Sequence, residues 1–106
     1  MMSKQVPPHS LAEWIPNVSQ LYKVLGDNTR LRILTLLLKR ELNVSEICAQ
    51  LGLEQSTVSH QLRVLRENHI VTNRREGKIV YYSLEDQHVR DILVETFTHV
   101  AHTAQE

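Results

Sequence analysis

The sequence has few of the features that would place it outside a reducing compartment. It contains a single cysteine, Cys48, in 106 residues, so it cannot form the internal disulfides of a small secreted domain. No apolar run approaches the roughly 20 residues that a membrane-spanning helix needs. Residues 1–8 also lack the apolar core of a secretory signal. We therefore expect a cytoplasmic protein without a membrane segment.

An excess of charge of one sign is also missing, because 12 basic and 12 acidic side chains give a formal net charge of zero. The chain as a whole is therefore not attracted to an anionic partner. The distribution is nevertheless uneven: residues 54–78 are mildly basic, whereas residues 79–106 contain one basic side chain, Arg90, and five acidic ones. The acidic segment also contains three of the six histidines, and carboxylates together with imidazoles are typical of cation binding.

The length allows one domain and leaves no room for a second. An apolar content of 42% with 23% charged residues is typical of a globular chain, which excludes general disorder and collagen-like repeats. We expect a flexible N-terminal arm over residues 1–9 and a single domain over residues 10–106. A chain this short buries a modest core, so formation of a dimer would stabilise it.

Two helices are expected at the start of the domain. Ser10–Glu13 has the pattern of a capping box, and a helix that begins there would end at Gly26. Pro16 either kinks this helix or marks its true first turn, and the sequence leaves both open. A second helix would follow a cap at Asp27 or Asn28. Its outward side chains would include Arg30, Arg32 and Lys39.

Two closely spaced helices follow. Asn43–Glu46 would start a short helix that ends at Gly52, and another helix would begin near Gln55. The buried face of the latter would contain Val58, Leu62 and Leu65. Two helices joined by a tight turn that contains a glycine form a helix-turn-helix.

A β-hairpin and a last helix complete the chain. Ile70–Arg75 and Lys78–Leu84 are β-prone runs, and the intervening Glu76-Gly77 predicts a hairpin turn. From Asp86 to about His102 the apolar residues return to a helical spacing. The predicted fold is therefore mainly α with a small β-hairpin. The order of the elements is that of a winged helix-turn-helix framed by two extra helices.

The fourth helix carries short polar side chains opposite its buried face, as does a helix that reads base edges in the major groove. The candidate DNA contacts on this helix are Gln55, Ser56, Thr57, Ser59, His60 and Arg63. Arg74, Arg75 and Lys78 crowd the hairpin tip, where they would reach the phosphate backbone or the minor groove. An ordinary solvated helix face would have the same composition, but the order of the surrounding elements favours DNA binding.

Segments in this order resemble the ArsR/SmtB family of bacterial metal-sensing repressors. They are Leu25–Leu34, Gln55–Leu62, and Arg75–Lys78 followed by Tyr81–Leu84. The resemblance implies a homodimeric winged-helix repressor, paired through its first and last helices, that leaves operator DNA when an inducer binds. One departure is Glu54, where many members have a Ser or Thr cap, so the first residue of the recognition helix stays open.

Histidines in the last helix indicate which inducer binds. His99 and His102 are three residues apart and share a helix face, and His88 lies eleven residues before His99 on that face. The two ends are about 16 Å apart along the axis, whereas a zinc–nitrogen bond is only about 2 Å long. One helix therefore cannot close a site. Two antiparallel copies can, with Asp86 and His88 of one chain beside the partner's His99 and His102.

These four ligands, three imidazoles and one carboxylate, suit tetrahedral Zn(II), and Co(II) should bind as a surrogate. The absence of thiolate argues against arsenic, mercury, cadmium and Cu(I). The alternative is that the histidines form a solvated helix flank, but four ligand types at a dimer seam favour the metal. The pattern also resembles the last-helix zinc site of the family's CzrA-like, zinc-sensing branch, which implies control of a zinc-efflux operon.

The zinc branch further implies a role for His69, which follows the recognition helix. Its backbone carbonyl would accept the ring N–H of the ligand His99 and so couple metal binding to DNA reading. Without this role, His69 is expected to be a turn residue. The family's other common metal site needs two cysteines that Glu41–Ser45 lacks, so that site should be absent.

Two other functions compete with zinc sensing. A repressor of the same fold would sense another signal, such as oxidation of Cys48, with structural histidines. The simpler interpretation of Cys48 is a small buried apolar residue. A small zinc enzyme is disfavoured, because four protein ligands leave no open position for water and no H-E-x-x-H motif is present. We therefore expect a regulator and not an enzyme.

Overall fold

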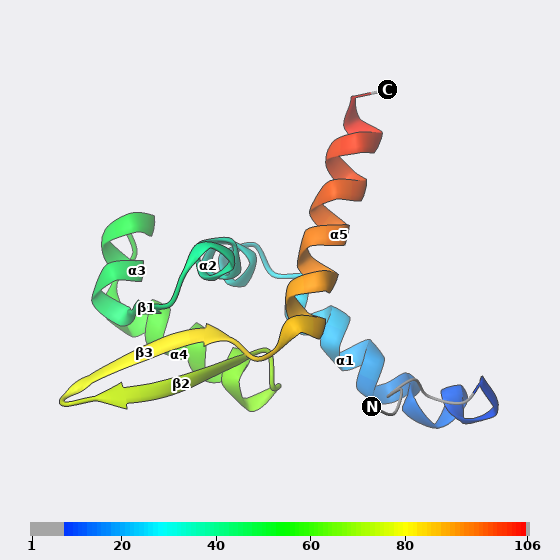
Figure 1. The fold of residues 1–106 in the computed structure, drawn as a ribbon, viewed down its shortest axis with the longest axis horizontal. Coiled ribbons are helices and arrows are strands. Elements are labelled where there is room, and N and C mark those ends of the chain that lie inside the picture. The colour runs from blue at the N-terminus through cyan, green and yellow to red at the C-terminus, as the bar shows by residue number, and fades with distance from the viewer. Residues whose placement is uncertain (1–7, 106) are drawn as a thin grey trace.

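The computed structural model describes residues 8–105, as helices around a small sheet (Figure 1). Residues 1–7 of the predicted arm lie outside the described residues, and Pro8 begins the first element. The elements are η1 (Pro8–Trp14), α1 (Ile15–Leu25), α2 (Asn28–Lys39), β1 (Leu42–Asn43), α3 (Val44–Leu51), α4 (Gln55–Glu67), β2 (Val71–Glu76), β3 (Ile79–Leu84) and α5 (Gln87–Ala104). This order confirms the predicted winged helix-turn-helix with a helical element on either side. None of the helices in residues 8–105 is long and apolar enough to span a membrane.

The prediction of an α-helix that starts at Ser10 is wrong. Residues 8–14 form the 3₁₀ helix η1, and the α-helix begins at Ile15, with Pro16 in its first turn. Proline fits there because the first turn leaves its backbone N–H groups without intrahelical acceptors. Of the two alternatives for Pro16, the structure supports the first-turn role. Gly26 ends the helix as predicted, although its φ of −82° is not left-handed.

The structure confirms the predicted cap of α2 but places one arginine, Arg30, differently from the prediction. The Asp27 carboxylate accepts the backbone N–H of Arg30 at 3.0 Å, which caps α2. The Arg30 side chain does not turn outward as predicted. Its Nε–H donates to the carbonyl of Val24 at 2.7 Å, and Nη1 donates to Oε1 of Gln61 at 3.0 Å. Arg30 therefore joins the end of α1 to the middle of α4.

The helix-turn-helix is built as the sequence predicts. The Asn43 side chain accepts the Glu46 N–H, and the Glu46 carboxylate accepts the Asn43 N–H, both at 2.9 Å. Gly52 ends α3 in the left-handed region, with a φ of 66°, where a Cβ would be strained. Glu54 precedes α4 without a capping side-chain bond. The predicted buried face of α4, Val58, Leu62 and Leu65, is fully buried.

The wing is larger than the predicted hairpin. Strands β2 and β3 pair antiparallel with Glu76 opposite Ile79, so the two-residue turn is Gly77-Lys78 rather than Glu76-Gly77. Gly77 has a φ of 64°, which a tight hairpin turn needs. On its other side β3 pairs with the short strand β1, with Asn43 opposite Tyr81. The sequence did not predict β1, because a two-residue strand has no periodicity of its own.

The last helix is anchored to the molecule only through its first half. Asp86 caps α5 by accepting the Val89 N–H at 3.1 Å, and Val89 and Leu93 are buried in the core. Arg90 donates from Nη1 to the carbonyl of Leu38 at 2.8 Å, which ties α5 to the end of α2. Beyond Leu93 the described side chains of α5 are exposed, and the helix rises away from the rest of the molecule (Figure 1).

Candidate DNA-reading surface and metal-ligand positions

The outer face of α4 presents the predicted base-reading side chains to solvent. Gln55, Ser56, Thr57, His60 and Arg63 are exposed, and Ser59 is half-buried. They lie opposite the fully buried face of the same helix, so burial of that face fixes their direction. Short polar side chains at the start of a helix allow close approach to base edges. Gln61, which was not predicted to have a role, is half-buried because it accepts the bond from Arg30.

An open hollow of about 310 Å³ joins this helix to the wing. Its lining includes Ser45 at the start of α3, Gln55 at the start of α4, and Lys78 in the turn of the wing. Two helix starts and a lysine thus face one concave surface. The partial positive charges of the two helix N-termini and the charge of the lysine favour an anion, so this surface suits the phosphates of a DNA backbone.

Two of the three predicted basic residues of the wing are available to a partner. Arg75 and Lys78 are exposed, and in the described part of the chain neither makes an ion pair. Arg74 differs, because its guanidinium pairs with Glu41: Nη2 lies 2.7 Å from Oε1 and Nε lies 2.8 Å from Oε2. Nη1 also lies 3.2 Å from a carboxylate oxygen of Glu76.

This ion pair alters the titration of both groups. The hydrogen bonds from Arg74 hold the pKa of the Glu41 carboxyl below its ordinary value of 4.5, against a smaller opposing effect of burial. In turn, the hydrogen bonds to Glu41 and then Glu76 raise the pKa of the Arg74 guanidinium. Sequence reasoning missed Glu41 because it lies 33 residues before Arg74, and no local pattern connects the two.

The predicted metal ligands lie at the two ends of α5. At the start, Asp86 Oδ2 is 3.7 Å from His88 Nδ1, and both side chains are largely exposed. His99 and His102 are exposed near the other end. Within residues 8–105 of one chain, no three side chains of the His, Cys, Asp and Glu types come close enough to hold a metal ion. The structure thus brings Asp86 and His88 together, and a site shared between chains stays a prediction.

His69 lies in the turn between α4 and β2, as the sequence predicts. It has a φ of 59°, which is unusual for a residue other than glycine, and its backbone N–H donates to the carbonyl of Arg66 at 3.1 Å. The side chain is exposed. No contact described in one chain tests its predicted coupling to His99.

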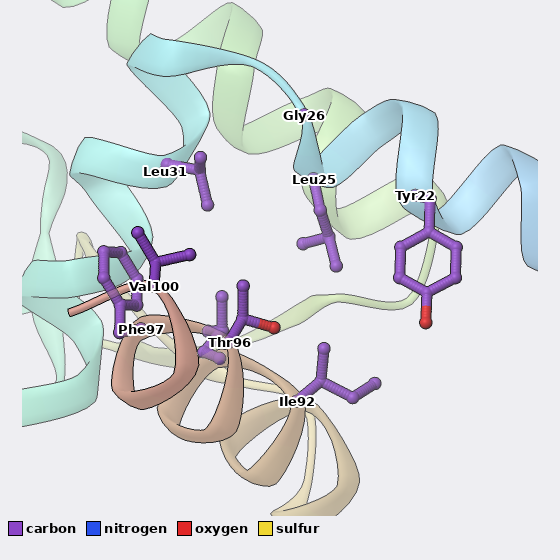
Figure 2. Close-up of a pocket in the computed structure, with 9 residues that line it drawn as sticks. Tyr22, Leu25, Gly26, Leu31, Ile92, Thr96, Phe97 and Val100 are labelled. Atoms are coloured by element: carbon purple, nitrogen blue, oxygen red, sulfur yellow. The ribbon is translucent and has the colours of Figure 1, made fainter. Parts of the chain in front are cut away.

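An apolar groove separates α1 from α5. Its volume is about 400 Å³, and side chains of both helices line it (Figure 2). The lining residues include Tyr22, Leu25, Leu31, Ile92, Phe97 and Val100. The outer surface of η1 and α1 adds Leu11, Trp14, Ile15 and Val18, all of which are largely exposed. An apolar surface of this extent is typical of a face that another molecule covers.

Comparison with known proteins assigns this architecture to a family. The family model described as "Bacterial regulatory protein, arsR family" matches residues 27–73, from the cap of α2 into β2. The "Transcriptional repressor SmtB homolog" of Synechocystis sp. is 37% identical over 98 residues, which cover 92% of this chain and 74% of that protein. The chain belongs to the arsR family. This arsR-family chain is also 39% identical over 84 residues, covering 78% of the chain and 69% of the relative, to the "Cadmium resistance transcriptional regulatory protein CadC homolog" of Staphylococcus aureus.

Solved structures of other proteins share the fold. The homodimeric winged helix-turn-helix DNA-binding domain Mb0332 of Mycobacterium bovis has a TM-score of 0.85 at 27% identity, covering 98% of this chain and 94% of that one. Reduced HlyU of Vibrio cholerae has a TM-score of 0.73 at 32% identity, covering 80% and 90%. Because these relatives are transcriptional regulators, the arsR-family chain is a regulator and not an enzyme, as expected.

Proposed function

We propose that this arsR-family chain is a zinc-responsive transcriptional repressor of the bacterial cytoplasm. A metal-free homodimer, paired through the α1 and α5 helices, binds operator DNA. Zn(II) bound at α5 favours a dimer conformation with lower affinity for DNA, and transcription of a metal-efflux operon follows. The cadmium-resistance regulator among its relatives supports a metal as the inducer, and the homodimeric neighbour supports the assembly.

The distribution of side chains along α5 carries this proposal. Asp86 and His88 are exposed at the start of the helix, His99 and His102 are exposed near its end, and Phe97 contributes to an uncovered apolar face between them. An antiparallel partner helix would cover that face. Antiparallel packing would also place the start of each α5 beside the end of the partner's α5, which would complete two four-ligand sites per dimer.

The donor set favours zinc over soft, thiophilic metals. Three imidazoles and one carboxylate suit a tetrahedral ion, and the only cysteine, Cys48, lies on α3 and not on α5. Soft thiophilic ions would need sulfur ligands, which these positions lack. When bound, the zinc would supply a bond between the two subunits and thereby fix their relative position. A hydrogen bond from the free ring N–H of His99 to the backbone carbonyl of His69 would connect the metal site to the end of α4.

The DNA contacts divide into two groups by chemistry. On α4, side chains that hydrogen-bond to bases would read the operator: Gln55, Ser56, Thr57, Ser59 and His60. Arg63 on α4 and the exposed wing residues Arg75 and Lys78 would contact phosphates, which carry no sequence information but fix the register. Operator binding should accordingly weaken steeply as the salt concentration rises.

Measurement of operator affinity with and without Zn(II) tests the proposal directly. The metal-free dimer should bind operator DNA, and stoichiometric Zn(II) should weaken that binding by at least tenfold, a typical size for allosteric coupling. DNA should weaken zinc binding by the same factor, because coupling free energies are reciprocal. Equal affinity with and without zinc would refute the inducer assignment while leaving DNA binding intact.

A mixture of two variants tests whether the site is shared between chains. His88→Ala and His102→Ala homodimers each lose one ligand from both sites, so each should give weak tetrahedral Co(II) absorption. A purified heterodimer of the two variants contains one site that lacks both residues and one intact site. It should recover about half the native absorption per dimer. No recovery would refute a site shared between the two chains.

A second candidate is a regulator of the same fold that senses oxidation. Cys48 is a half-buried free thiol that packs against the core beside α4, and the reduced form of HlyU is one of the structural neighbours. In that case mild oxidant, rather than Zn(II), should change operator affinity, and Cys48→Ser should abolish the response. The half-buried position favours the packing role, since oxidation requires access to solvent.

A further inference from the structure

We propose that Arg74 is a positioning residue that fixes the wing to the helix-turn-helix through Glu41, and that it is not itself a phosphate contact. The pair, named here the wing latch, would set the direction in which Arg75 and Lys78 reach the DNA backbone. This inference rests on the proposed DNA binding, and it revises the role that the sequence alone assigns to Arg74.

The first support is the way the donors of Arg74 are used. Nε and Nη2 form two parallel bonds to the Glu41 carboxylate, at 2.8 and 2.7 Å, and Nη1 bonds to Glu76 at 3.2 Å. The guanidinium carbon also lies 4.8 Å from the centre of the Tyr81 ring, so one face of the group is covered. A phosphate would have to displace carboxylates that already match the planar fork.

The second support is the local charge. Arg74 contacts two carboxylates, those of Glu41 and Glu76, so the cluster as a whole carries a formal charge of −1. A cluster with that charge repels a phosphate. Arg75 and Lys78 make no ion pair within residues 8–105, and their charges are available to DNA. Arg74 and Arg75 are neighbours on β2, but within the described residues Arg74 is paired with carboxylates and Arg75 is not.

The third support is the place of the wing latch in the sheet. Arg74 lies on β2 opposite Tyr81 of β3, and Tyr81 lies opposite Asn43 of β1. The Arg74 side chain therefore crosses β3 to reach Glu41, which directly precedes β1. Asn43 is also the cap of α3. The latch thus connects the outer strand of the wing to the segment that begins the helix-turn-helix.

Glu41→Gln distinguishes the wing latch from a phosphate contact by the sign of its effect. If Arg74 contacted phosphate, removal of the Glu41 charge would free the arginine, raise operator affinity and steepen the salt dependence. If Arg74 positions the wing, the same change should lower operator affinity by about tenfold and leave the salt slope unchanged. Arg74→Met should have a similar effect, and the double variant should be no worse than either single one.

Arg75→Ala is the matched control, because it removes a neighbouring charge of the same kind. Loss of one phosphate contact should reduce the slope of log affinity against log salt by about one. A slope that changes equally in Arg74→Met and Arg75→Ala, or an affinity that rises in Glu41→Gln, would overturn the inference. Arg74→Lys should bind operator DNA more tightly than Arg74→Met but less tightly than the unaltered protein, because an ammonium group cannot form the paired bonds.

Failure of the proposed function is recognised separately. If the unaltered dimer does not prefer operator over random DNA, the proposed function is wrong, and the wing latch is then tested without DNA. In that case Arg74→Met and Glu41→Gln should each speed amide hydrogen exchange in β2 and move the Tyr81 ring resonances, while Arg75→Ala changes neither. Unchanged exchange and resonances in the two latch variants would overturn the inference.

Discussion

The two halves of the molecule differ in how much of their apolar surface is buried within a single chain. The reading half, α2 to β3, buries Ile33, Ile47 and Leu62 fully and closes the starts of α2 and α3 with side-chain caps. The assembly half, η1, α1 and the part of α5 beyond Leu93, leaves half or more of Trp14 and Tyr22 exposed, at 50% and 64%. Most of the core lies in the reading half, with Val24 and Leu25 of α1 added to it, whereas the outer surface of the assembly half is built for a second molecule.

The largest expected effect of a single substitution lies in the reading half. Leu62→Ala removes a fully buried side chain between α4 and the rest of the core, and it should lower the free energy of unfolding by about 2–5 kcal/mol. Gln50→Ala on the exposed side of α3 is the control and should change it by less than about 0.5 kcal/mol. Urea titration measures both. Similar losses in the two variants would contradict a self-contained core.

The second effect concerns association rather than folding. Phe97→Asp puts a charge into the apolar face of α5, where the aromatic ring is 43% exposed in one chain. The dimer should dissociate roughly 30-fold more readily, the equivalent of about 2 kcal/mol. Sedimentation of the metal-free protein measures this. Glu95→Ala, on the other side of the helix, should leave association unchanged, and an unaffected Phe97→Asp dimer would show that α5 is not the seam.

A smaller effect is expected at the cap of α3. Asn43→Ala removes the side chain that accepts the Glu46 N–H, so it should reduce the free energy of unfolding by about 1 kcal/mol. Asn17→Ala in α1, whose side chain makes no capping bond, serves as the comparison. Thermal unfolding of both variants at equal concentration is sufficient. If the cap variant is as stable as the unaltered chain, capping does not contribute to the independence of the reading half.

The smallest expected effect is a change in the pKa of one carboxyl group, that of Glu41. Because Arg74 lowers the pKa of Glu41, the stabilising ion pair is complete above pH 4.5 and is lost as the pH falls through the lowered value. In Arg74→Met the pKa of Glu41 should therefore rise toward its ordinary value. NMR of the Glu41 carboxyl carbon during an acid titration follows this directly. An identical pKa in both proteins would mean that the ion pair does not persist in solution.

The parts of the fold that the sequence predicts are those with local causes. The capping box of Asn43 and Glu46 spans three residues, Gly52 directly follows its helix, and the buried face of α4 repeats at helical spacing. Of the two missed parts, one depends on a distant partner and the other on the segment directly before α1. Strand β1 exists because β3 pairs with it, and the start of α1 moved because residues 8–14 adopt a 3₁₀ helix instead of the capped turn predicted at Ser10.

The same distinction applies to the candidate site. The outward polar face of α4 follows from the helical period, so its residues could be identified in advance. The surroundings of Arg74 could not, since Glu41 is brought to it by sheet pairing. The ligands on α5 were likewise identified as residues, but whether they meet depends on a second chain.

Arg30 gives the two halves a mechanical connection. From one planar group it donates to one carbonyl in the last turn of α1, that of Val24, and to Gln61 in the middle of the recognition helix. A rotation of α1 against its partner would strain these bonds, and it would break one of them, change the Arg30 side-chain conformation or carry α4 with it. In a two-fold dimer the same coupling would act once in each chain, in directions related by the two-fold axis. The spacing between the two recognition helices would then change with every shift at the seam, and that spacing determines which separation of DNA half-sites the protein fits.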